Sequence, residues 1–105
     1  MSQAPLPTGA VELAGDVLLV RGCILIGNAQ QLADAGVQLL GPAGTGRVTV
    51  DFSAATDIDS SALAVLFSWQ RRMQLNGGTL AVCSAPEAVH SLAKVYGVSD
   101  QLVWA

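Results

Sequence analysis

The sequence predicts a single α/β domain with a mostly parallel sheet of four or five strands, an N-terminal hairpin and about three helices. Short apolar stretches alternate with segments of helical periodicity along the chain. Each helical segment ends in glycine, which commonly terminates helices. The segments between successive strands are long enough to be crossover helices, and such crossovers join parallel strands. At 105 residues the chain fits one domain.

The first third of the chain is expected to contain a hairpin and a helix. Residues 1–9 hold two prolines and a glycine and are expected to form a flexible tail, so the domain is expected to span residues 10–105. Two apolar strands then flank a tight turn at Gly15 and Asp16. A helix over residues 28–40 is predicted to begin at Asn28, a good N-cap, and to end at Gly41.

The remaining elements are predicted from alternation, caps and glycine stops. Residues 47–52 alternate as a strand, and a second helix is expected over residues 60–75. Residues 79–83 form an apolar central strand, and Pro86 opens a third helix that Gly97 ends. Residues 102–104 are expected to add an edge strand.

The composition excludes several classes of function. The chain is 51% hydrophobic and 12% charged, with a net charge of -3 and five scattered basic residues. Binding to nucleic acid needs clustered positive charge, and so does binding to anionic membranes. No stretch is long enough to span a membrane, and the N-terminus lacks the pattern of a signal peptide. We therefore expect a cytoplasmic protein that reaches the inner face of the inner membrane only through a partner.

No catalytic, cofactor or metal site is predicted. Residues 41–47 superficially resemble a phosphate-binding loop, but a helix precedes them, a strand follows and arginine replaces the required lysine. His90 is the only histidine, and no serine sits in a nucleophile-elbow pattern. Cys23 and Cys83 have no short-spaced pairing with each other or with His90. Both are expected to be reduced, small core residues. A small enzyme or nucleotide-binding protein would need a titratable pocket that these residues do not suggest.

The most informative segment surrounds two aspartates and two serines. Asp57 and Asp59 are expected in a short loop, and Ser60 and Ser61 at the start of the second helix. In one interpretation Asp59 or Ser60 caps the helix by accepting hydrogen bonds from its free amide groups. In the other, Ser61 or Ser60 is a phosphoacceptor at the positive end of the helix dipole. The sequence leaves both open.

The second helix is unusually apolar around its circumference. Its apolar residues span roughly 200°, wider than the stripe of an ordinary surface helix. Val65 and Trp69, with Arg72 beside them, are predicted to form one flank that binds a partner, since tryptophan and arginine are frequent in binding hot spots. The alternative is that a thin domain buries this helix deeply.

The chain resembles the STAS domain family over nearly its whole length after the predicted tail. The resemblance rests on the hairpin, the strand VTVDFS, the motif DIDSSALAVL and the segment NGGTLAVCS. The family's motif is an aspartate, two small or hydroxyl residues, then glycine and leucine. In this chain it begins at Asp59, and Ala62 replaces the glycine.

Two branches of the family are similar to this chain in different respects. In anti-sigma-factor antagonists a partner kinase phosphorylates the second hydroxyl, which corresponds to Ser61. In MlaB-type proteins the first hydroxyl matters for function, which corresponds to Ser60. The serine pair resembles the antagonist motif, whereas residues 91–98 resemble a run typical of the MlaB branch. The longer C-terminal run favours the MlaB branch.

The resemblance implies a non-catalytic subunit that binds and supports the ATPase of an ABC transporter moving phospholipids between bacterial membranes. It implies no cofactor. The expected site comprises the partner-binding or regulatory residues Asp57, Asp59, Ser60, Ser61, Val65, Trp69 and Arg72. The alternative is an anti-sigma-factor antagonist that binds a serine kinase and is switched by phosphorylation at Ser61.

Overall fold

Five strands form one mixed sheet in the computed structural model, which describes residues 9–41 and 46–105. The strands are β1 (Ala10–Ala14), β2 (Val17–Ile24), β3 (Arg47–Ile58), β4 (Thr79–Cys83) and β5 (Val103–Trp104). They pair in the order β1-β2-β3-β4-β5. The β1–β2 hairpin is antiparallel and the other three pairings are parallel. The predicted fold class is confirmed.

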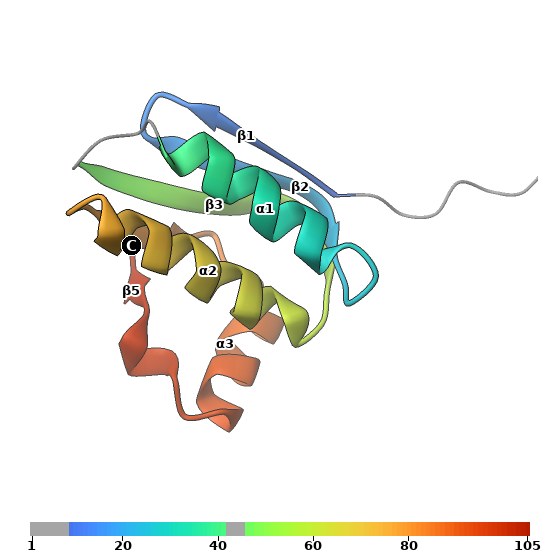
Figure 1. Ribbon diagram of the computed structural model, residues 1–105. Helices are drawn as coiled ribbons and strands as arrows, with labels where there is room; N and C mark the ends of the chain where they lie inside the picture. Colours follow the sequence, from blue (N-terminus) through green and yellow to red (C-terminus); the bar gives the residue numbers. More distant parts are fainter. Residues whose placement is uncertain (1–8, 42–45) are drawn as a thin grey trace, which may run out of the picture.

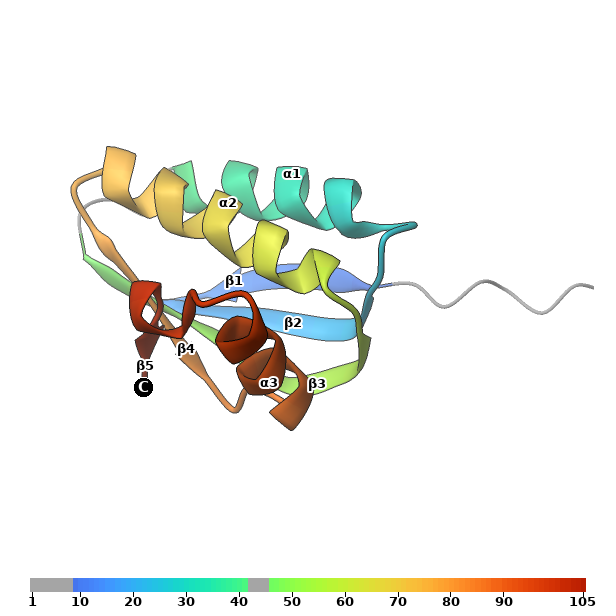
Figure 2. The ribbon, with the colours of Figure 1, turned by 90° about the horizontal axis from the view of Figure 1, so that it is seen from below.

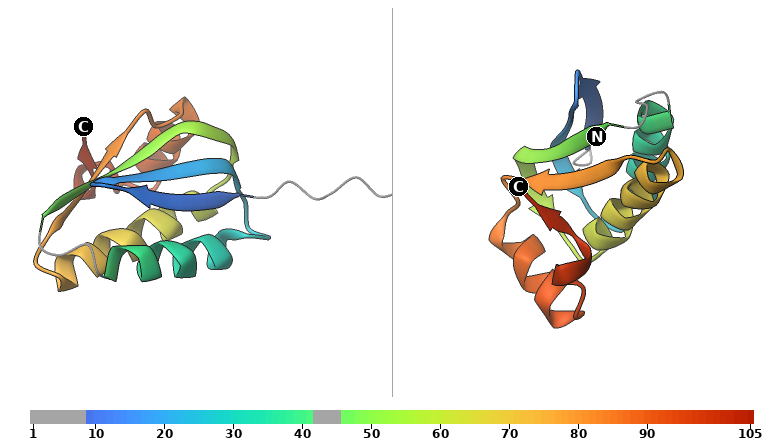
Figure 3. Two further views of the ribbon diagram at one scale, coloured as in Figure 1. Left: turned by 90° about the horizontal axis from the view of Figure 1, so that it is seen from above. Right: turned by 90° about the vertical axis from the view of Figure 1, so that its left-hand side faces the viewer.

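Three helices pack on this sheet: α1 (Ala29–Leu40), α2 (Ser61–Leu75) and α3 (Glu87–Val95). Helices α1 and α2 lie side by side over one face (Figures 1 and 2). Helix α3 packs near α2 toward the β5 end of the sheet, and the short helix η2 (Ser99–Gln101) follows it (Figure 3). Among the described residues, no helix is long and apolar enough to cross a membrane.

The core lies between the sheet and the helices, and β3 contributes alternate residues to it. Val48, Val50 and Phe52 of β3 are buried, whereas the strand residues between them are only half-buried. The alternation follows from the two-residue period of a strand, which sends successive side chains to opposite faces. Burial of each such side chain stabilises the fold by roughly 1.5–3 kcal/mol. Cys23 is also buried, as predicted, whereas Cys83 is half-buried at the end of β4.

The predicted exposed flank of α2 is wrong for two of its residues. Val65 and Trp69 are 2% and 0% exposed and belong to the core. The Trp69 indole lies against Gly36 of α1, and its Nε1–H donates to the carbonyl of Ala33 at 3.2 Å. The wide apolar surface of α2 therefore exists because the helix contacts both the sheet and α1. The deep-burial alternative is correct.

Arg72, the third residue of that predicted flank, lies in the last turn of α2. It is half-buried, and its guanidinium lies beside Gly41 at the end of α1. Twelve residues separate it from Ser60, which is about 18 Å along a helix. Arg72 is therefore at the opposite end of α2 from the serine motif.

Strand β3 is longer than predicted and includes Asp57, which was expected in a loop. It continues through Asp57 and Ile58. The extension was not visible in the sequence because its pairing with β2 is irregular. Leu19 and Arg21 of β2 pair with Asp51 and Ala54 of β3, so β3 has one residue more than β2 between these pairs. A second shift of the same kind follows between Gly22 and Ile24 of β2. Each extra residue in β3 is a bulge, which breaks the alternation and bends the strand.

The helix ends follow the predicted stops. Gly77 and Gly97 have φ angles of 80° and 69°, a left-handed conformation that glycine adopts without strain. Asn28 precedes α1, but its side chain does not cap the helix and binds the loop before it instead. His90 of α3 stacks on Trp104 with ring centroids 4.4 Å apart.

Residues 1–8 of the predicted tail and most of the 41–46 loop lie outside the described residues, and the domain boundary at residue 10 stays a prediction.

The contact between α1 and α2 predicts the effect of a single methyl group. A Cβ at Gly36 would overlap the Trp69 indole. We expect Gly36→Ala to lower the free energy of unfolding by about 1–3 kcal/mol through overpacking, although alanine favours helix more than glycine does. Urea unfolding followed by circular dichroism measures this change.

Gly27→Ala is the control, since nothing lies within 4 Å of a Cβ at Gly27. Equal stability of Gly36→Ala and the unmodified protein would contradict the described contact between the helices.

Candidate functional site

The candidate site lies where β3 ends and α2 begins. The last residues of β3 are exposed or half-buried, and Asp59 and Ser60 connect the strand to the first residue of the helix, Ser61. The second of the two bulges in β3, between Ala55 and Ile58, lies just before this connection. Bulges often occur next to functional sites, where they redirect side chains.

Asp59 organises this connection with both oxygens of its carboxylate. Oδ1 accepts the backbone N–H of Ser61 at 2.9 Å and also the Ser61 hydroxyl. Oδ2 accepts the backbone N–H of Ile26 at 2.9 Å, and Ile26 lies in the loop between β2 and α1. The backbone N–H of Asp59 donates to the carbonyl of Ile24 at 3.1 Å. Asp59 therefore links the start of α2 to the neighbouring loop.

These hydrogen bonds favour the ionised carboxylate. The Ser61 hydroxyl is the main cause that lowers the pKa of Asp59, and the backbone N–H groups of Ile26 and Ser61 lower it further. Partial burial of the carboxylate opposes them by raising the pKa. The net effect is a lowered pKa, so Asp59 carries its negative charge at neutral pH.

Of the two predicted caps, Asp59 is the one that binds the helix start. Ser60 precedes α2, but its side chain makes no capping hydrogen bond. The first turn is closed instead by backbone bonds from Ala62 to Asp59 and from Leu63 to Ser60. The capping interpretation is therefore confirmed through Asp59.

The two serines differ in their surroundings. The Ser61 side chain is half-buried, and its hydroxyl donates to Asp59. The Ser60 side chain is exposed and forms no hydrogen bond to any described residue. The Ser60 hydroxyl is thus the one that an approaching protein can contact without breaking an existing bond.

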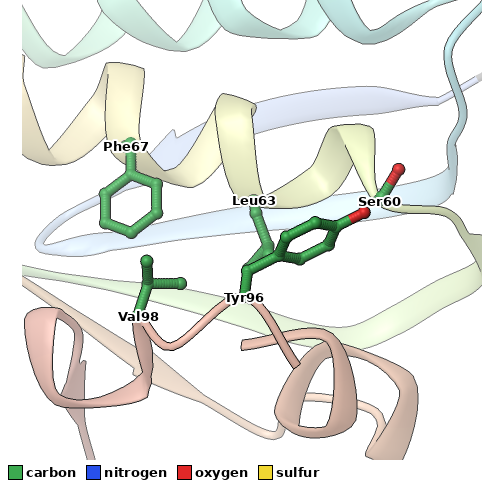
Figure 4. A pocket seen from close by; sticks show the side chains of 5 residues that line it. All are labelled: Ser60, Leu63, Phe67, Tyr96 and Val98. Carbon is green, nitrogen blue, oxygen red and sulfur yellow. The ribbon is translucent and has the colours of Figure 1, made fainter. Parts of the chain in front are cut away.

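A shallow apolar pocket adjoins Ser60. It has a volume of about 270 Å³ and lies between α2 and the segment that links α3 to η2 (Figure 4). Its lining consists of Ser60, Leu63, Phe67, Tyr96 and Val98. In Figure 4 the Tyr96 ring lies beside Leu63 with its hydroxyl directed toward Ser60. Tyr96 is 60% exposed, so an apolar group and a hydroxyl are both offered to solvent at this point.

The structure brings four of the seven predicted site residues together. Asp57, Asp59, Ser60 and Ser61 are consecutive or nearly so, and Asp57 is exposed at the end of β3. Val65, Trp69 and Arg72 are not part of this group, because two are in the core and the third is at the far end of α2.

Sequence reasoning missed two exposed residues near the site. Ile26 is 86% exposed in the loop that Asp59 holds, and Tyr96 borders the pocket. Tyr96 lies within the C-terminal run that resembles the MlaB branch, which was a usable signal. Ile26 follows an apolar strand directly, so nothing in its sequence context distinguishes it from a core residue.

The groups that this site presents are a carboxylate, hydroxyls and apolar side chains. Among the residues that the structure describes, no group of three or more histidine, cysteine, aspartate or glutamate side chains could hold a metal ion. Hydrogen bonds orient the carboxylate, the hydroxyls belong to Ser60, Ser61 and Tyr96, and apolar side chains reach solvent beside them. Such a mixture of apolar contact and oriented polar groups is typical of protein interfaces.

A family model described as MlaB, STAS domain, matches residues 9–104. The chain belongs to the STAS domain family. No curated protein sequence matches this STAS domain significantly.

Solved structures share the fold of this STAS domain. The unphosphorylated form of the anti-sigma factor antagonist SpoIIAA is 13% identical, with a TM-score of 0.70 over 93% of this chain and 88% of that chain. An anti-sigma factor antagonist from Mycobacterium paratuberculosis is 21% identical, with a TM-score of 0.69 over 98% and 89%. A STAS domain protein from Planctomyces limnophilus is 16% identical, with a TM-score of 0.71 over 92% and 87%. At these identities the likeness concerns the fold.

The hydrogen bonds of Asp59 predict a pH-dependent contribution to stability. We expect Asp59→Asn to lower the free energy of unfolding by about 1 kcal/mol at neutral pH, because asparagine is uncharged and has one accepting oxygen where the carboxylate uses two. The pKa of Asp59 is lowered in the folded state, so its stabilisation is present above the ordinary aspartate pKa and is lost as pH falls through the lowered value. The difference between variant and unmodified protein should therefore shrink in acid. Urea titrations between neutral and strongly acidic pH measure it.

Asp57→Asn is the matched control, because Asp57 is exposed and accepts no hydrogen bond from the described residues. A stability loss in Asp59→Asn that stays constant into strong acid would show that the charge is not the stabilising feature.

Proposed function

We propose that this chain is a non-catalytic cytoplasmic subunit that binds and supports the ATPase of an ABC transporter moving phospholipids between bacterial membranes. The observation that carries the proposal is the difference between the two serines. Ser60, the position that matters in the MlaB-type branch, is exposed beside the pocket, whereas the Ser61 hydroxyl is already bonded to Asp59. The MlaB description of the matching family model supports the same branch.

The proposed interface is centred on Ser60. A partner that covers Ser60 also covers the pocket of Leu63, Phe67 and Tyr96, where apolar side chains are available for burial. Apolar burial supplies affinity at such an interface, and the free hydroxyl supplies a directed hydrogen bond. The subunit carries no membrane-binding surface of its own in this proposal and reaches the inner membrane through the ATPase.

The second candidate is an anti-sigma-factor antagonist that binds a serine kinase. The Ser60 and Ser61 pair favours it, and so do the names of the solved structures with this fold. Phosphorylation at Ser61 would have to break the hydrogen bond between its hydroxyl and Asp59. It would also bring a second negative charge next to that carboxylate, which is unfavourable.

Adding a charge at Ser60 tests the proposed interface. We expect the tagged protein, purified from its native cells, to carry an ABC-type ATPase in stoichiometric amount, as identified by mass spectrometry. Ser60→Glu should reduce the affinity for that ATPase by about tenfold or more, because a carboxylate would be desolvated at the contact. Titration of the purified proteins measures the affinity.

Gln38→Glu is the matched control: it also adds one negative charge at an exposed position, but on α1. A co-purifying serine kinase, with phosphate found on Ser61, would contradict the transport proposal and support the antagonist. Equal affinity of Ser60→Glu and Gln38→Glu for the ATPase would contradict the placement of the interface at Ser60.

A further inference from the structure

The loop between β2 and α1 presents an isoleucine to solvent. Ile26 is 86% exposed, the most exposed of the large hydrophobic side chains in the described part of the chain. Next to it, a Cβ at Gly27 would meet nothing within 4 Å. The tip of this loop therefore packs against little of the protein.

Hydrogen bonds within the loop hold its two ends but not its tip. The Asn28 side chain accepts the N–H of Leu25 at 2.8 Å and donates to the carbonyl of Cys23 at 2.9 Å. The N–H of Asn28 donates to the carbonyl of Leu25 at 3.0 Å. These bonds are local, and none of them involves Ile26.

The tip is held from outside the loop by Asp59. The N–H of Ile26 donates to Asp59 Oδ2 at 2.9 Å, across 33 positions of sequence. The other oxygen of the same carboxylate accepts both the N–H and the hydroxyl of Ser61. One rigid group thus bonds the loop tip with one oxygen and Ser61 with the other.

We infer that Asp59 is a positioning residue that couples Ser61 to the β2–α1 loop, so that Ile26 keeps its position only while Asp59 is bonded to Ser61. A carboxylate is planar, and its two oxygens cannot be reoriented independently. When the Ser61 hydroxyl is removed, only the N–H of residue 61 orients the carboxylate, and Oδ2 holds the N–H of Ile26 less firmly. When a negative charge takes the place of the hydroxyl, the carboxylate turns and Oδ2 leaves that N–H. The loop tip then loses its bond to the rest of the protein.

The coupling deepens the proposed function and rests on it for its biological role. The N–H of Ile26 bonds to Asp59, the residue that precedes Ser60 in the chain, so the loop tip adjoins the proposed interface. A change at Ser61 would then alter the surface that the partner contacts without unfolding the domain. The coupling itself belongs to the isolated chain and can be measured without any partner.

The test compares the exchange of the Ile26 amide with water by NMR in the full ¹⁵N-labelled chain. We expect exchange at Ile26 to be about tenfold faster in Ser61→Glu, since the lost bond is to a charged acceptor. Ser61→Ala should give a smaller increase, because the N–H of residue 61 still orients the carboxylate. In an Asp59→Ala background, Ser61→Ala should have no further effect at Ile26.

Ser60→Glu and Ser60→Ala are the matched controls, one position away and without a bond to Asp59. Unchanged exchange at Ile26 in both Ser61 variants would overturn the coupling, and so would an equal response to Ser60→Glu. If Ser61→Glu does not fold, the exchange rate at Ile26 in Ser61→Ala is by itself the test of the coupling. Failure of the proposed function would give a different result: no ATPase would co-purify, while exchange at Ile26 would still respond to the Ser61 variants.

Discussion

The packing of the Trp69 indole against Gly36 is the constraint on which the rest of the structure depends. The absence of a side chain at Gly36 lets α1 and α2 approach closely, and the indole N–H finds its acceptor at Ala33. A buried indole with a satisfied N–H holds two helices in one relative position. Because this contact fixes α2 against α1, the first turn of α2 is held at the end of β3, where Asp59 joins it to the β2–α1 loop.

Much of the fold could be predicted from the sequence because its signals are local. Alternation predicted the start of β3, and the glycines at 77 and 97 predicted the ends of α2 and α3. The errors came where tertiary contacts decide. The second half of β3 was missed because bulges remove its alternation. Trp69 was assigned to a partner-binding flank because a helical wheel cannot show that a second helix, with a glycine facing the indole, already covers that flank.

The candidate site, like the fold, could be predicted from the sequence only in part. The motif from Asp59 to Ser61 was found from residue types and spacing, and its position at a helix start follows from capping chemistry. The difference between Ser60 and Ser61 is not visible in the sequence, since both are serines at the same helix end. It arises from the direction in which the Asp59 carboxylate points, which Ile26 helps to determine from a distant part of the chain. Contacts of this kind join the Asp59 carboxylate, the Ser61 hydroxyl and the β2–α1 loop into one hydrogen-bonded unit.

The central claim is that this STAS domain acts by binding a protein through the surface around Asp59. Hydrogen–deuterium exchange of the chain, with and without the proposed ATPase partner, tests this claim most directly. The account predicts that the ATPase protects the backbone amides of residues 25–28, 59–64 and 95–98, with little change in the β1–β2 hairpin. Protection confined to the hairpin or to the far end of α2 near Arg72 would contradict it.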